Sequence, residues 1–238
     1  MKKILSALRR ADEHFALLDN ADRIAVGLSG GKDSMVLLCA LHYYKMYMKK
    51  SYELVSLTVD LGFNGFDTGA IEQYAHSLGI EHRTLHTQIG EIVFDIRKEK
   101  NPCALCAKMR KGALYAAAKE MGCNKAAFAH HIDDVIETFL MSLLYEGRMH
   151  TFAAKTHLSR QDITLVRPLI YAREHDIACY AQKKSLPVCK NPCPASGYTK
   201  REEAKEILAG WYRLRPGAKE SIENAVKTGL LDQNNTQT

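Results

Sequence analysis

Residues 26–34 read Val26-Gly27-Leu28-Ser29-Gly30-Gly31-Lys32-Asp33-Ser34, between apolar runs at 23–28 and 35–41. This arrangement predicts a loop that leaves a buried strand and enters a helix, where free backbone N–H groups and the helix dipole favour an anion. The two central glycines let the chain pass close to phosphate oxygens, and the serines and the lysine add donors. Asp33 repels phosphate unless a cation lies between them, which indicates a magnesium-bridged nucleotide.

Two other interpretations of this loop fit less well. In a Walker loop, Ser or Thr directly follows the lysine, whereas Asp33 follows Lys32 here. A turn that only links a strand to a helix would not need so many phosphate-type donors. We therefore predict nucleotide binding by Ser29, Gly30, Gly31, Lys32, Asp33 and Ser34.

The length and composition of the chain limit the class of protein that carries this loop. A chain of 238 residues, 46% of them hydrophobic, can bury a substantial core as one domain with additions at its ends. No apolar stretch approaches the roughly 18 to 20 residues of a membrane span, so we expect a cytoplasmic protein with no membrane partner. The formal net charge of +6 permits a nucleic-acid partner without demonstrating one.

Basic residues gather in two segments that would suit a phosphate backbone. The alternative is an ordinary solvated helix face. The first segment holds Arg97, Lys98, Lys100, Lys108, Arg110, Lys111 and Lys119, and the second holds Lys200, Arg201 and Lys205.

Strand-like and helix-like runs alternate along the chain, which predicts an α/β fold with a mostly parallel sheet covered by helices. The expected strands are 22–28, 53–60, 81–86, 125–130 and 163–167, and the expected helices are 34–49, 66–79, 104–121, 134–146 and 172–185. We divide the chain into an N-terminal helix (1–20), a nucleotide-binding domain (21–198) and a C-terminal helical extension with a disordered tail (199–238). Ligands of such sheets bind beyond the carboxyl ends of the strands.

A second polar stretch, Ala129-His130-His131-Ile132-Asp133-Asp134, follows the fourth expected strand. It should meet the glycine-rich loop at one edge of the sheet. Its histidines and carboxylates could hold magnesium, orient the nucleotide or move protons. Capping of the following helix would explain one of the two aspartates without catalysis. We predict catalytic roles for Asp33, His131, Asp133 and Asp134, and nucleotide contact for His130.

The cysteines indicate a second functional centre. Seven cysteines without an export signal favour thiols, a metal or a cluster over disulfides. Cys103 and Cys106 precede an expected helix, so both thiols can point at one centre, and we predict Cys193, in a similar proline-bounded loop, as a third ligand. Three thiolates suit an iron–sulfur cluster with one open iron. Zinc completed by histidine or water, and a redox dithiol of Cys103 and Cys106, are the alternatives.

The other cysteines carry weaker signals. Cys189 could be a spare ligand, a persulfide carrier or a bystander. The apolar surroundings of Cys39, Cys123 and Cys179 predict small buried thiols.

Taken together, the motifs resemble a known family. Ser29–Ser34 is similar to the PP-loop of ATP pyrophosphatases, which alone indicates only that superfamily. The resemblance to the TtcA-like tRNA thiolation enzymes rests on the combination of this loop with further motifs over about residues 20–210. These are Cys103-x-x-Cys106, His130-His131-x-Asp133-Asp134, Arg167-Pro168-Leu169 and Pro192-Cys193-Pro194.

The resemblance implies an adenine nucleotide α-hydrolase-like fold and ATP-dependent sulfur transfer to cytidine in the tRNA anticodon loop. AMP would be placed on the C2 oxygen of cytosine, and sulfide held on an open iron would replace it. The matching positions imply that Ser29–Ser34 bind the ATP phosphates, with Asp33 acting partly through Mg²⁺, and that Val59 and Asp60 lie near the adenosine. They also imply a [4Fe-4S] cluster on Cys103, Cys106 and Cys193. The implied partners are tRNA and a sulfur donor, either a cysteine desulfurase or sulfide, and a homodimer is left open.

Three competing functions remain. A lysidine synthetase would use the same activation but would not need the cysteines. A 2-thiouridine synthetase of the zinc-finger-bearing group is closer, yet residues 1–20 contain no cysteine for its leading zinc module. A nucleotide-binding iron–sulfur sensor would not need the second polar stretch at 129–134.

Overall fold

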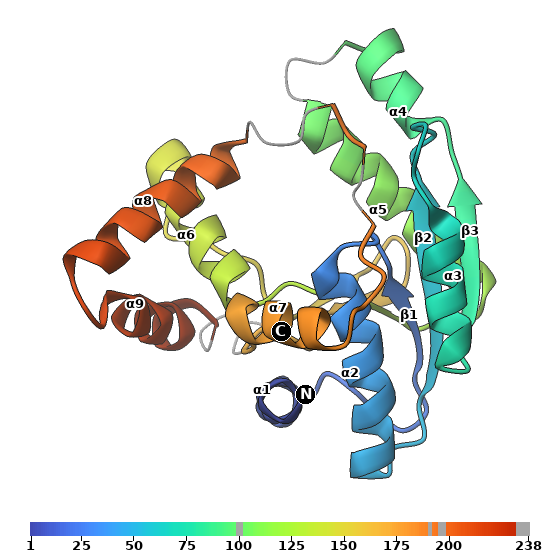
Figure 1. Ribbon diagram of the computed structural model, residues 1–238, viewed down its shortest axis with the longest axis horizontal. Coiled ribbons are helices and arrows are strands. Elements are labelled where there is room, and N and C mark those ends of the chain that lie inside the picture. Colours follow the sequence, from blue (N-terminus) through green and yellow to red (C-terminus); the bar gives the residue numbers. More distant parts are fainter. Residues whose placement is uncertain (99–101, 190–191, 195–198, 232–238) are drawn as a thin grey trace.

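The computed structural model describes residues 1–98, 102–189, 192–194 and 199–231. Within them a six-stranded sheet has the order β3-β2-β1-β4-β6-β5. The parallel strands are β1 (Arg23–Gly27), β2 (Glu53–Asp60), β3 (Glu81–His86), β4 (Lys125–Ala127) and β6 (Ile163–Val166). The strand β5 (Lys155–Leu158) pairs antiparallel with β6 at one edge. The predicted α/β fold with a mostly parallel sheet is confirmed (Figure 1).

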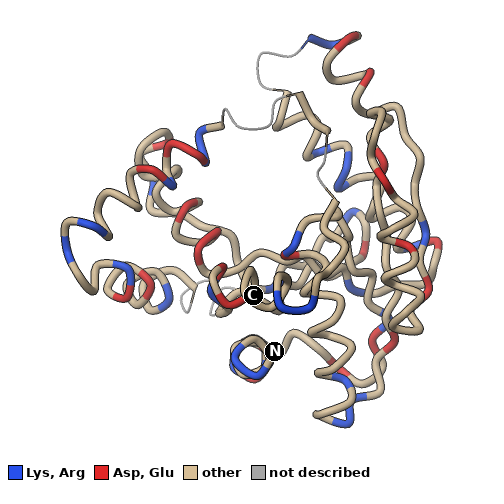
Figure 2. Tube along the Cα trace, viewed as in Figure 1, with Lys and Arg blue, Asp and Glu red and all other residues tan. Residues whose placement is uncertain are grey.

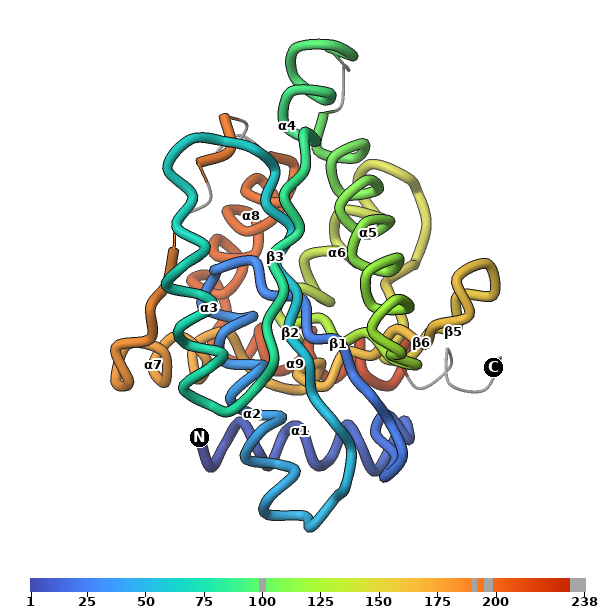
Figure 3. The backbone as a smooth tube through the Cα atoms, turned by 90° about the vertical axis from the view of Figure 1, so that its right-hand side faces the viewer, coloured from blue at the N-terminus to red at the C-terminus, as the bar shows by residue number. Residues whose placement is uncertain are grey.

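Helices cover both faces of this sheet. One face carries α2 (Lys32–Met48) and α3 (Thr68–Ser77), with α1 (Lys2–Phe15) and α7 (Glu174–Lys183) packed on α2. The other face carries α5 (Pro102–Glu120), which contacts β2 and β4. Figure 3 shows α3 and α5 on opposite sides of the sheet.

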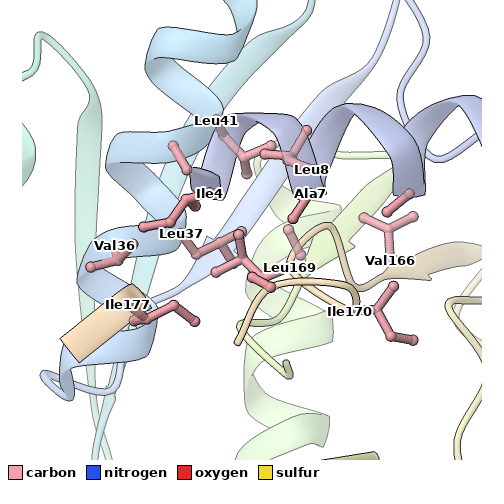
Figure 4. Close-up of a cluster of buried hydrophobic side chains, with 14 of the residues drawn as sticks. Ile4, Ala7, Leu8, Val36, Leu37, Leu41, Val166, Leu169, Ile170 and Ile177 are labelled. Carbon is pink, nitrogen blue, oxygen red and sulfur yellow. The ribbon is translucent and has the colours of Figure 1, made fainter. Parts of the chain in front are cut away.

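Two buried clusters correspond to these two faces. The larger one includes Ile4 and Leu8 of α1 together with Leu37 of α2, which meet beside Leu169 and Ile177 (Figure 4). The smaller one joins strand residues to Leu114, Tyr115 and Ala118 of α5. Burying apolar surface on both sides makes the sheet a rigid support for the loops at its carboxyl edge.

A second group of helices stands beside the sheet, on the left in Figure 1. It consists of α6 (Ile132–Glu146), α8 (Lys200–Leu214), α9 (Ala218–Val226) and the π-helix η2 (Lys227–Leu231). Ala204, Leu208 and Val226 belong to the same buried cluster as Leu140 of α6, so these helices pack onto the main core. The division at residues 20 and 198 stays a prediction, as does the disordered tail, which falls in 232–238, outside the described residues.

Several elements differ from the sequence-based expectation. The strand expected to reach residue 130 ends at Ala127, because His131 caps α6 and residues 128–130 connect the two elements. The strand β5 and the limb formed by α4 (Ile89–Glu91) and the π-helix η1 (Ile92–Ile96) carried no recognised signal. None of the helices in the described part of the chain is long and apolar enough to span a membrane.

Candidate active site

The predicted phosphate loop is folded by its own serines. The Ser34 hydroxyl donates to Gly31 O at 2.9 Å and accepts from Ser29 N–H at 3.2 Å, while Ser29 Oγ accepts from Gly31 N–H at 3.3 Å. Gly31 is the N-cap position of α2, with φ −73° and ψ 155°. The loop therefore presents the start of α2 to its ligand, as an anion site at a helix N-terminus requires.

Gly30 requires the absence of a side chain. Its φ of +78° lies in the left-handed region, and a Cβ there would stand 3.2 Å from Ile71 Cδ1 and 3.2 Å from Cys189 Cβ. Cys189 N–H also donates to Gly30 O at 2.9 Å. The backbone at Cys189, four residues before Cys193, is thus bonded to the phosphate loop.

A cavity of about 270 Å³ opens beside this loop at the carboxyl ends of β1, β2 and β4. Apolar side chains form much of its wall, and a Cβ on Gly27 would stand 3.0 Å from Leu114 Cδ1. This mixture of an apolar wall and a few polar groups is typical of a nucleotide pocket. The lining residues are Gly27, Leu28, Ser29, Asp33, Ser34, Leu57, Val59, Phe66, Arg110, Lys111, Leu114, Phe128, Ala129, His130 and Asp134.

The start of α6 faces the phosphate loop. The N-cap is His131, 3% exposed, rather than either aspartate: its Nδ1 accepts from Asp134 N–H, and Asp134 Oδ2 accepts from His131 N–H at 3.0 Å. His131 Nε2 also lies 3.7 Å from Asp33 Oδ1, a buried oxygen without a hydrogen bond. An orphaned carboxylate oxygen of this kind, near Asp134, is suited to a divalent cation.

Cations from the later helices neutralise the carboxylates of this site. Arg201 of α8 donates to both Asp134 Oδ1 and Glu137 Oε2 at 2.9 Å, and Lys219 of α9 contacts Asp133 Oδ1 at 2.5 Å. Although burial opposes it, the hydrogen bond from Glu174 N–H and the Lys219 ammonium lower the pKa of Asp133. In Glu137, which is 3% exposed, burial outweighs the cations and raises the pKa.

Lys32 of the phosphate loop is held in the same way. Its ammonium contacts Glu174 Oε1 at 2.8 Å and Asp33 Oδ2 at 3.2 Å. Despite the opposing effect of burial, these carboxylates raise the pKa of Lys32. Glu174 opens α7, so three helices that follow the sheet in sequence, α7, α8 and α9, each contribute a charge that orients the site.

A group of cations lies on the opposite wall. Arg110 and Lys111 of α5 line the cavity, and Arg167, 7% exposed, stands behind it over the Phe152 ring at 4.8 Å. Burial lowers the pKa of Arg167 to about 10, and its buried Nε has no hydrogen-bond partner. Burial, reinforced by the Arg167 charge, lowers the pKa of His130 to about 3. This wall favours anions, and it holds His130 as a neutral imidazole.

The predicted cluster ligands approach one another at the start of α5. Burial raises the pKa of the Cys106 thiol, Arg110 opposes the shift, and the charges of Cys193 and Cys103 raise the pKa further. All three cysteines are free thiols. As they stand, no three His, Cys, Asp or Glu side chains within the described residues form a ready-made metal site.

Two other cysteines have distinct surroundings. Cys189 Sγ donates to Asp67 O at 3.4 Å, beside the phosphate loop. The choice of Cys193 over Cys189 as the third ligand stays a prediction. Cys179 was expected to be buried, which is wrong: the helix turns it outward, where its Sγ lies 3.5 Å from His175 Nε2.

The structure brings most of the predicted site residues together. Ser29, Asp33, Ser34, Val59, His130 and Asp134 line the cavity, Gly30, Gly31 and Lys32 complete the loop, and His131 and Asp133 support it from behind. Asp60 is not among the lining residues: its carboxylate accepts from Gly62 N–H and contacts His86 Nδ1, both at 3.0 Å. Its role stays a prediction. Glu174 and Lys219 were missed because no local pattern marks them, and Arg201 was noted only as a member of a basic segment.

Sequence comparisons agree with this geometry. Residues 3–203 match the family described as the PP-loop domain. A tRNA-cytidine(32) 2-sulfurtransferase from Geobacter sulfurreducens is 35% identical over 228 residues, which is 94% of this chain and 89% of the relative. The protein of the same name from Syntrophotalea carbinolica is 37% identical, over 94% of this chain and 88% of its own.

Solved structures show the same architecture. The U34-tRNA thiolase NcsA from Methanococcus maripaludis, determined with its [4Fe-4S] cluster, superposes with a TM-score of 0.73 at 25% identity, over 94% of this chain and 77% of that one. An NH3-dependent NAD synthetase from Campylobacter jejuni, at 14% identity and a TM-score of 0.53, shares the fold alone. It covers 95% of this chain and 93% of its own.

Proposed function

The chain belongs to the PP-loop domain family, and on this premise we propose that it is an ATP-dependent tRNA sulfurtransferase that converts cytidine to 2-thiocytidine. The relatives named tRNA-cytidine(32) 2-sulfurtransferase match over nearly the whole chain, which supports both the reaction and cytidine 32 as its target. The enzyme uses ATP and Mg²⁺, and it carries a [4Fe-4S] cluster as the neighbouring thiolase does.

One observation carries the proposal: a single helix links the nucleotide cavity to the predicted cluster ligands. The third and fourth turns of α5 supply Arg110, Lys111 and Leu114 to the cavity wall, and its first two turns carry Cys103 and Cys106. A nucleotide-binding module alone would not need the thiols, and a dithiol protein would not need the cavity. Sulfur transfer to an activated base needs both side by side.

In the first half-reaction, the chain's residues hold ATP for attack at its α-phosphorus. The C2 oxygen of cytosine forms a bond to that phosphorus while the bond to pyrophosphate breaks. The Ser29–Ser34 loop and the N-terminus of α2 hold the phosphates by backbone N–H groups, and Lys32 adds a positive charge. Fixed donors of this kind stabilise charge that grows in the transition state.

In the second half-reaction, a sulfur nucleophile bonds to C2 and AMP leaves with the former cytosine oxygen. Arg110 and Lys111 stand on the wall between the phosphate loop and the cysteines, so they can stabilise the departing phosphate charge. His130 stays neutral near pH 7 because its pKa is about 3, and it can accept a hydrogen bond without repelling the base.

The residues present fit both implied cofactors. Asp33 Oδ1 and the Asp134 carboxylate are hard oxygen ligands of the kind that bind Mg²⁺. Cys103, Cys106 and Cys193 are free thiols whose charges interact, and three such ligands would leave one iron of a [4Fe-4S] cluster open to sulfide. The sulfide donor, a cysteine desulfurase or free sulfide, and a homodimer belong to the proposal, as does a cytoplasmic location, where tRNA is modified.

Nucleoside analysis of tRNA by mass spectrometry tests this function. Bulk tRNA from a strain without the gene should lack 2-thiocytidine, and the wild-type gene should restore it. The Asp33→Asn and Cys103→Ala variants should both fail to restore it, for different reasons: the first should lose Mg·ATP affinity and the second should keep it.

The alternatives predict other nucleoside profiles. Loss of 2-thiouridine instead of 2-thiocytidine would move the target to uridine, and loss of lysidine would point to an amine nucleophile. An unchanged profile in the deletion strain would reject the enzyme and favour a nucleotide-binding sensor. Adding back purified protein, ATP, sulfide and unmodified tRNA checks that the activity resides in this chain.

A further inference from the structure

The basic residues of the chain differ in whether a carboxylate contacts them. Several of them are fixed by carboxylates: Lys119 contacts Asp162 Oδ2 at 3.0 Å, and Arg201 and Lys205 contact Glu137 at 2.9 and 3.7 Å. Each of these cations already has a carboxylate partner, which offsets part of its charge.

Five other basic residues have no such partner in the described part of the chain and lie together on one surface, which we call the α5 limb and define as residues 89–98 and 102–111. No side-chain hydrogen bond or ion pair joins any of its five cations to a described residue. The five are Arg97, Lys98, Lys108, Arg110 and Lys111. Glu91 and Asp95 are its acidic residues, so five positive and two negative charges leave a net +3.

Figure 2 shows blue segments at the outer end of the α5 limb, beside red ones, and further blue segments on α5. The helix α8 also contains four basic residues. It contains three acidic residues as well, so its formal net charge is only +1. Of those four, Arg201 and Lys205 are tied to Glu137, and Lys200 lies over the Tyr145 ring at 4.5 Å. The two basic segments of the sequence are therefore not equivalent in the fold.

The α5 limb is also built as a firm support. Leu105 and Met109 of α5 pack with Val93 of η1 on Leu61 and Ile89, in a small apolar cluster of their own. This packing turns Lys108 outward while Arg110 faces the cavity. A row of free cations on a packed helix suits a polyanion whose own shape is fixed.

We propose that the α5 limb is the surface that holds the phosphate backbone of the substrate tRNA next to the nucleotide to be modified. This inference rests on the proposed function, because the base must reach both the cavity and the cysteines. Both lie along the first four turns of α5, so the phosphates beside the base must pass over the same stretch. Proteins recognise RNA sequence mostly in single-stranded loops whose bases are splayed out. Contacts to the flanking phosphates fix the position of the RNA on the protein.

Salt dependence of RNA binding tests the surface. The probe is a fluorescent anticodon stem-loop RNA bound to the purified, cluster-loaded protein, with the dissociation constant measured by anisotropy over a range of KCl. Removing one cation that touches a phosphate should reduce the slope of log K against log[salt] by roughly 0.7 to 0.9. The double variant Arg97→Gln, Lys108→Gln should therefore lose roughly 1.4 to 1.8 of slope.

The matched control is Lys119→Gln, on the same helix but paired with Asp162, and it should leave the slope unchanged. Affinity for Mg·ATP should stay constant in all three proteins, because none of these side chains lines the cavity. A wild-type slope in the double variant would overturn the proposed surface. A smaller salt slope in the double variant Lys200→Gln, Arg213→Gln would instead indicate that the RNA binds at α8, and this result would also overturn the proposed surface.

Failure of the proposed function gives a different result. If the wild-type protein does not bind the stem-loop at any salt concentration, tRNA is not its substrate. This result would reject both the proposed function and the proposed tRNA-binding surface. If the wild type binds but the limb variants match it, the thiolation function stands and only the location of the RNA is wrong.

Discussion

Replacing Gly30 with alanine should separate the two constraints that act on the phosphate loop. With φ at +78°, any residue with a Cβ bears the cost of the left-handed conformation, about 1–2 kcal/mol. The new methyl group would also stand 3.2 Å from Ile71 Cδ1 and 3.3 Å from Cys189 O, a backbone atom that cannot rotate away. Overpacking of this kind adds about 1–3 kcal/mol.

Gly79 provides the matched control. It has a similar φ of +68° at the end of α3, and a Cβ there would meet nothing within 4 Å. Both substitutions reduce the entropy of the unfolded chain equally, so this effect cancels between them. Gly30→Ala should therefore be about 1–3 kcal/mol less stable than Gly79→Ala.

Urea unfolding followed by circular dichroism measures this difference, and calorimetry measures Mg·ATP affinity. Because the methyl group pushes the loop away from Cys189, we expect Gly30→Ala to bind Mg·ATP at least about tenfold more weakly, which corresponds to about 1.4 kcal/mol. Gly79→Ala should bind it normally. Equal stability of the two variants would refute the tight fit of the loop between Ile71 and Cys189.

Three other perturbations probe the rest of the site. Because the pKa of His130 is about 3 in the fold and about 6.5 in an unfolded chain, the unfolded state takes up the proton first as pH falls. Urea titrations should then show stability falling between pH 6.5 and 3, by about 2 kcal/mol at most from pH 7 to 5. His130→Gln should remove this dependence. Glu137→Gln leaves Arg201 with one carboxylate fewer and should cost about 1–3 kcal/mol, with faster hydrogen exchange in α8 as the specific signature. Anaerobically purified Cys103→Ala should lack iron and sulfide by chemical analysis, whereas Cys179→Ser should retain both, and iron in the first variant would contradict the ligand assignment.

Local patterns were sufficient for the centre of the sheet and for the phosphate loop. The apolar run before Ser29 and the polar stretch after β4 are each contiguous in sequence, and parallel topology alone brings them to one edge. The same reasoning failed at Cys179, because the apolar content of a helix does not say which side faces water. The alternative that one aspartate only caps α6 is met in part, because Asp134 accepts from His131 N–H in a capping box, while His131 takes the N-cap position itself.

The charges that orient the site could not be predicted. Arg201 meets Asp134 across 67 positions of sequence, and Lys219 meets Asp133 across 86. Both contacts depend on how α8 and α9 pack against α6. This packing is tertiary structure, and no periodic pattern in the sequence predicts it. Arg167 was noted only as part of a motif, and its burial is evident only in the three-dimensional structure.

The position of α5 explains how one fold can combine two chemistries. Cys106 and Leu114 are eight residues apart on this helix, which corresponds to roughly 12 Å at 1.5 Å per residue, and Arg110 and Lys111 lie between them. A helix packed on the sheet keeps this separation constant, whereas a loop would let it vary. Cys189, four residues before the third predicted ligand, donates its N–H to Gly30 O, so the backbone at Cys189 is bonded directly to the nucleotide loop.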